Sequence, residues 1–78
     1  MNKHIYKRYY ITCGGKYFCR TCIRDGKLYA IWGSKFSAME YKQITSVNAM
    51  KEKLEKEYIQ GYHEGKPVEI ETIERNFY

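Results

Sequence analysis

Two short glycine-containing turns constrain the first half of this chain. A Gly-Gly pair at 14–15 and an Asp-Gly pair at 25–26 each separate segments rich in Tyr, Ile and Phe. Both pairs tolerate positive φ angles at consecutive residues, as a two-residue type I′ β-hairpin requires. The sequence therefore predicts three antiparallel strands, at about 4–12, 17–24 and 27–33.

The turns also determine which side chains share a face. Across the second turn, the register predicts the cross-strand pairs Ile23–Leu28, Thr21–Ala30 and Cys19–Trp32. We expect this face, which also takes Tyr6, Arg8, Tyr10 and Tyr17, to be the core. The opposite face carries more of the charge and is expected to be exposed. A slip of one residue would exchange the two faces.

A helix and one more strand are predicted in the second half. The segment 34–44 allows two readings, a short strand or a connection that crosses the sheet. Thr45 or Ser46 is expected to cap a helix over 46–62, which Gly61 or Gly65 ends before Pro67. Its apolar stripe is Val47, Met50, Leu54, Tyr58 and Tyr62.

The alternating segment 68–73 predicts a final strand at a sheet edge. The order β-β-β-α-β predicts an α+β fold with a three- to four-stranded antiparallel sheet packed on one helix, and 1–78 is expected to be a single small domain. The chain has neither a long apolar run nor an apolar signal core, so we expect no membrane partner. Three cysteines without an export signal favour a reduced, cytoplasmic protein.

Charge is distributed unevenly. Residues 1–35 carry eight Lys/Arg and one acidic residue, Asp25, whereas the remainder carries six Lys/Arg and eight Glu. A basic surface interleaved with aromatic rings suits a polyanion, because cations contact phosphates and rings stack on bases. Alternatively, Tyr–Arg pairs only stabilise a solvated sheet face. The predicted binding residues are Lys7, Tyr9, Phe18, Arg20, Arg24, Lys27 and Tyr29.

No catalytic pattern is recognisable, so we expect a non-enzymatic binding module without a cofactor. His63 beside Glu64 is interpreted as a surface pair. Cys19 and Cys22 form a CxxC, but residues three apart on a strand point to opposite faces, so no metal is expected. Zinc remains the alternative, with Cys13 and a distant histidine (His4 or His63) completing the ligand set.

Two local resemblances bear on function. Tyr-Phe-Cys-Arg-Thr-Cys-Ile-Arg-Asp-Gly, at 17–26, resembles part of the zinc-binding segment of late-competence DNA helicases. Three strands and a helix over 16–58 are similar to the arm-binding N-terminal domain of tyrosine integrases, which lays its sheet in the DNA major groove. That resemblance implies that Arg20, Arg24, Lys27 and Tyr29 face DNA. The chain departs from the family in its long segment before the helix and in the acidic strand after it.

A short chain rich in Lys, Ile, Tyr and Asn also resembles small orphan proteins of phages and mobile elements, which include anti-CRISPR and other anti-defence inhibitors. Two hypotheses follow. In the first, an accessory protein binds DNA or RNA through its basic sheet face. In the second, an inhibitor occludes a nucleic-acid-processing host protein with the same Tyr- and Arg-rich face. A homodimer through the uncovered face is compatible with both.

Overall fold

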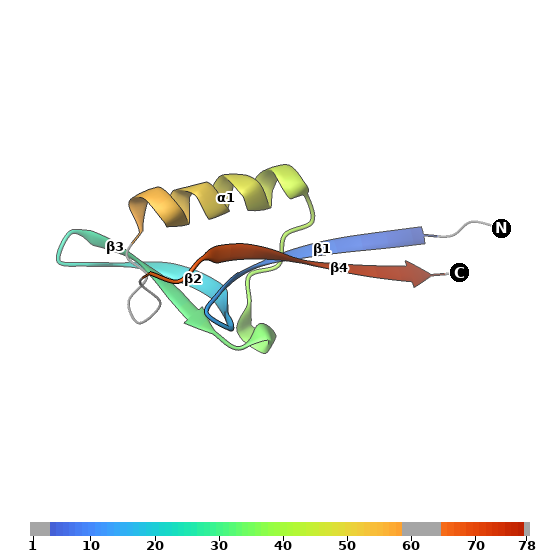
Figure 1. The fold of residues 1–78 in the computed structure, drawn as a ribbon, viewed down its shortest axis with the longest axis horizontal. Helices are drawn as coiled ribbons and strands as arrows, with labels where there is room; N and C mark the ends of the chain where they lie inside the picture. Colours follow the sequence, from blue (N-terminus) through green and yellow to red (C-terminus); the bar gives the residue numbers. More distant parts are fainter. Residues whose placement is uncertain (1–3, 59–64, 78) are drawn as a thin grey trace.

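The computed structural model describes residues 4–58 and 65–77, with side chains described over 6–58 and 65–74. Its elements are β1 (His4–Cys13), β2 (Lys16–Arg24), β3 (Lys27–Gly33), the short 3₁₀ helix η1 (Lys35–Ser37), α1 (Ile44–Glu57) and β4 (Val68–Phe77). The strands form one antiparallel sheet in the order β3-β2-β1-β4, which confirms the α+β fold, the element order and the edge position of β4. In Figure 1, α1 lies on one side of the sheet and η1 on the other.

Both hairpin turns have the predicted backbone conformation. The φ angles are 58° and 83° at Gly14 and Gly15, and 52° and 75° at Asp25 and Gly26. Positive φ at both central residues is the type I′ geometry, whose twist matches that of the flanking strands. The two turns therefore set the local pairing at the end of each hairpin.

The core lies between α1 and the sheet. Val47 and Leu54 of α1 are fully buried and are two helical turns apart, so they lie on one helix face. Met50 and Tyr58 pack against the same core, which confirms the predicted stripe as far as Tyr58. The buried sheet residues are Ile11, Cys13, Phe18, Ala30 and Val68.

The bounds of α1 differ from those predicted. The helix begins at Ile44, after Gln43, and Gln43 makes no side-chain capping hydrogen bond. The backbone N–H of Val47 closes the first turn on the Gln43 carbonyl at 3.2 Å, so neither Thr45 nor Ser46 is the cap. The helix ends at Glu57 because Tyr58 is extended, with φ −111° and ψ 143°. Tyr62 and Gly61 lie outside the described residues.

A β-bulge at Cys19 corrects the predicted faces. Ile23–Leu28 and Thr21–Ala30 pair as predicted, but Trp32 opposes Phe18 instead of Cys19. One extra residue in a strand reverses the side-chain alternation beyond it. Phe18 therefore lies on the α1 side, with its ring 5.8 Å from that of Trp32, centroid to centroid.

The same reversal applies to β1. Ile11 is fully buried and Tyr9 packs against the core, so these alternate residues face α1. Arg8 and Tyr10 consequently lie on the opposite, open face, together with Tyr17. The prediction that the core face takes Tyr6, Arg8, Tyr10 and Tyr17 was wrong, because the bulge puts β1 and the start of β2 out of phase with β3.

The segment after η1 is the connection that crosses the sheet. The N–H of Met39 donates to the Phe18 carbonyl at 2.9 Å, while Tyr9 and Tyr41 exchange two backbone hydrogen bonds of 2.8 and 2.9 Å. This segment enters between β1 and β2, which pair with each other only beside their turn. It divides the sheet into the β2–β3 hairpin, called the arm below, and the β1–β4 pair, called the ribbon. Figure 1 shows the arm and the ribbon running to opposite ends of the molecule.

Candidate nucleic-acid interface

The arm brings together part of the predicted binding face. Its register pairs Arg20 with Ile31, Cys22 with Tyr29 and Arg24 with Lys27. Residues two apart on a strand share a face, so all six lie on the face opposite Ala30 and α1. The four predicted site residues on this face of the arm are Arg20, Arg24, Lys27 and Tyr29.

The three cations of this face are exposed to solvent. Within 6–58 and 65–74, no carboxylate lies within ion-pair distance of Arg20, Arg24 or Lys27. Asp25 is the only acidic residue between 16 and 33, and it lies in the turn at the tip of the arm. The arm therefore presents positive charge that no described side chain neutralises.

The other three predicted residues lie elsewhere. Phe18 is only 2% exposed, and Tyr9 is half-buried against the core, so neither ring is placed to stack on a base. Lys7 is exposed but belongs to the ribbon, opposite Glu74 of β4. The prediction of one shared face for all seven residues was therefore wrong, and what remains is a cationic surface with one half-buried tyrosine.

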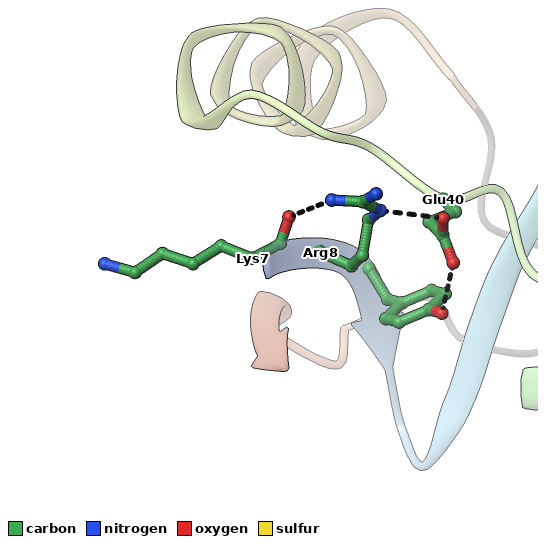
Figure 2. A network of polar contacts seen from close by, with 4 residues as sticks. Lys7, Arg8 and Glu40 are labelled. Atoms are coloured by element: carbon green, nitrogen blue, oxygen red, sulfur yellow. Dashed lines mark hydrogen bonds and ion pairs between the residues drawn. The ribbon is translucent and has the colours of Figure 1, made fainter. Parts of the chain in front are cut away.

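In the ribbon, in contrast, Arg8 has a carboxylate partner. Arg8 Nε lies 3.1 Å from Glu40 Oε1, and the Tyr10 hydroxyl donates to Glu40 Oε2 at 2.8 Å. A second guanidinium nitrogen of Arg8 donates to the Lys7 carbonyl at 2.9 Å. Figure 2 shows Glu40, from the crossing connection, reaching Arg8 of β1. The positive charge of Arg8 is thus compensated within the fold.

Lys35 of η1 is compensated in the same way. Its Nζ lies 3.2 Å from Glu71 Oε2 and 5.6 and 5.8 Å from the ring centroids of Tyr10 and Tyr17. The Tyr17 hydroxyl donates to the Glu71 carboxylate at 2.9 and 3.0 Å. That hydrogen bond, more than burial or the repulsion between the two negative charges, raises the pKa of Tyr17. We call Arg8, Tyr10, Tyr17, Lys35, Glu40 and Glu71 the paired network.

Sequence reasoning missed the two acceptors of this network. Glu40 and Glu71 lie about 30 and more than 50 residues from their hydroxyl donors, Tyr10 and Tyr17. No local pattern reports such a contact. The alternation of β4 places Glu71 on one face, but its partner depends on where η1 and the crossing connection lie.

The three cysteines have different surroundings. Cys13 is buried with its Sγ 3.6 Å from the Lys66 carbonyl, and Cys19 occupies the bulge. No three His, Cys, Asp or Glu residues converge as metal ligands in the part of the chain that the structure describes. The predicted His63–Glu64 pair lies outside that part.

Neither α1 nor η1, the two helices of the described residues, has the length and apolar character needed to cross a membrane. Comparison of the chain with models of known protein families, with curated proteins and with solved structures found no match in any of the three.

Proposed function

We propose that this protein is a non-enzymatic module that binds nucleic acid on the open face of the arm. One observation carries the proposal: Arg20, Arg24 and Lys27 share an exposed face and have no carboxylate partner among the described side chains. An unpaired cation can displace the counterions condensed on a phosphate backbone, and this release drives association. Arginine adds a planar fork that binds two phosphate oxygens at once.

The arm favours a duplex over a single strand. A two-stranded β-ribbon fits the major groove of B-DNA. Single-strand binding depends on aromatic rings that stack on successive bases. Phe18 is buried, Tyr9 packs against the core, and Tyr17 is bonded to Glu71 and lies under Lys35. Tyr29 is therefore the ring of the arm that remains available on the cationic face. Double-stranded DNA is therefore the ligand that we propose.

The alternative is an inhibitor that occludes a nucleic-acid-processing host protein. Ile23 is 70% exposed on the helix side of the arm, and Met39 and Ile44 are 43% and 45% exposed near the crossing connection. Apolar side chains of this kind can anchor a protein interface. A homodimer through the open face of the arm is less favourable, because it would bring the cations of both copies together. Three cysteines without a disulfide among the described residues fit a reducing compartment such as the cytoplasm.

The test is a salt titration of binding to a labelled DNA duplex, single-stranded DNA and single-stranded RNA. Between about 50 and about 200 mM salt, phosphate-driven binding weakens steeply, and the log–log slope falls by about 0.9 for each duplex phosphate contact that is lost. R20Q/R24Q is expected to weaken duplex binding and to flatten this slope.

K42Q/K53Q is the matched control, because it removes the same charge from two exposed lysines outside the arm. It is expected to keep the wild-type slope. If none of the three nucleic acids binds at low salt, or if both double variants lose the same affinity, the proposal is wrong.

A further inference from the structure

Phe36 is the most exposed apolar side chain that the structure describes. Its exposed fraction is 101%, against 70% for Ile23, the next most exposed large apolar residue. A phenylalanine normally buries about 150–250 Å² of surface in a core or an interface. The fold places no described side chain over this ring, so the ring stabilises nothing within the described part of the chain.

The turn that carries Phe36 is held in place. Within η1, the N–H of Ser37 donates to the Ser34 carbonyl and that of Ala38 to the Lys35 carbonyl, both at 3.1 Å. On one side, Lys35 forms its ion pair with Glu71. On the other, Met39 is hydrogen-bonded to β2. A ring presented on such a turn loses little conformational entropy when it binds.

η1, the turn that carries Phe36, lies on the side of the sheet that the arm cations face. η1 follows directly on β3 and lies on the side of the sheet opposite α1 (Figure 1). Lys35, its neighbour, lies over Tyr10 and Tyr17 of the open face. From Lys27 to the end of β3 the strand has seven residues, which corresponds to roughly 20 Å. That length matches about six nucleotide steps along one strand of a duplex.

We propose that Phe36 inserts between two base pairs at one end of the DNA segment that the arm contacts. The inference rests on the proposed function and adds a mode of binding to it. The three cations without a described carboxylate partner make a polyanion the fitting partner. The flat phenyl ring can stack on a neighbouring base pair. Phenylalanine wedges of this kind unstack one base step and kink the duplex. Flexible TA and CA/TG steps are the preferred insertion points, because they cost the least to unstack.

The experiment uses F36A and, as a matched control, I23A, which removes an exposed apolar side chain from the helix side of the arm. Both variants are expected to fold like the wild type, as circular dichroism would show, because each side chain is mostly exposed. F36A is expected to bind the duplex roughly tenfold more weakly with an unchanged salt slope. I23A is expected to bind like the wild type.

A duplex with 2-aminopurine at a central TA step provides the second readout. Wild-type binding is expected to raise its fluorescence as the step unstacks, F36A to leave it unchanged, and F36W to restore the rise. If F36A binds and unstacks the step like the wild type, the insertion proposal is wrong and the proposed function stands. If the wild type binds no nucleic acid, the proposed function fails as well, and Phe36 becomes a candidate anchor for a protein.

Discussion

The ribbon and the arm are both two-stranded and both carry basic residues, yet they differ in how far carboxylates within the fold neutralise those residues. In the ribbon, Arg8 is held by Glu40, and Glu71 of β4 holds Lys35 of η1. In the arm, Arg20 and Arg24 have no such partner among the described side chains. The acceptors come from segments distant in sequence. The difference teaches that a count of basic residues overstates the positive surface of the ribbon, where, among the described side chains, Arg8 is compensated and Lys7 is not. The arm, in contrast, presents three cations without a described carboxylate partner on one face.

The largest expected effect tests whether Phe18 of the arm belongs to the core or to the binding surface. F18A removes a core ring and is expected to lower the free energy of unfolding by about 3–5 kcal/mol. Urea denaturation measures it. F18L, which keeps an apolar group in the site, is expected to cost less and to leave nucleic-acid binding unchanged. An F18A variant of wild-type stability that has lost duplex binding would place Phe18 in the interface.

The shape of the arm depends on its turn. Gly26 has a φ of +75°, and a Cβ added there meets no atom within 4 Å, so only backbone strain opposes a side chain. G26A is expected to lower the stability by about 1–2 kcal/mol and to weaken duplex binding as the tip loosens. D25N is the control, since Asn also tolerates the left-handed conformation. If G26A is destabilised but binds the duplex like the wild type, the tip of the arm does not contribute to DNA binding.

Releasing Arg8 of the ribbon and Lys35 of η1 should make their surface resemble the arm. E40Q/E71Q removes both carboxylates of the paired network and frees Arg8 and Lys35. We expect severalfold tighter duplex binding and a steeper salt slope, with little change in stability, because exposed ion pairs contribute at most about 1 kcal/mol. E57Q/E69Q changes the net charge equally at two exposed glutamates that form no ion pair among the described residues, and should have a smaller effect. Equal gains in both variants would mean that only net charge matters.

The smallest effect is a dependence of stability on pH within the paired network. The raised pKa of Tyr17 means that its contribution is fully present below its ordinary pKa of 10.0 and is lost as the pH rises through the raised value. The stability difference between wild type and Y17F should therefore be constant near neutral pH and shrink above about pH 10. Urea denaturation across this range measures it, and a difference that grows above pH 10 would contradict the hydrogen bond.

Local chemistry made much of the fold predictable. The dipeptides Gly14-Gly15 and Asp25-Gly26 set both turns, and the spacing of Val47, Met50 and Leu54 gave the buried face of α1. The bulge was not predictable, because nothing around Cys19 distinguishes an extra residue from a paired one. That single residue moved Phe18 from the predicted exposed face into the core.

The candidate site was predictable only in part, for a related reason. Arg20, Arg24, Lys27 and Tyr29 follow the register of one tight turn, so their shared face could be deduced from the sequence. The pairing of Arg8 with Glu40 depends on the path of the crossing connection between β1 and β2. No sequence pattern predicts that path. Local register was therefore predictable, and long-range charge compensation was not.

The most direct test of the central claim is a map of backbone amide shifts in a nuclear magnetic resonance titration with a DNA duplex. The account predicts that the perturbed amides cluster at Arg20–Tyr29 of the arm and extend to Phe36, with the amides of Tyr6–Tyr10 and the outer face of α1 little changed. Perturbations concentrated on the ribbon, or spread evenly over all basic residues, would contradict the claim that the unpaired cations of the arm form the binding surface.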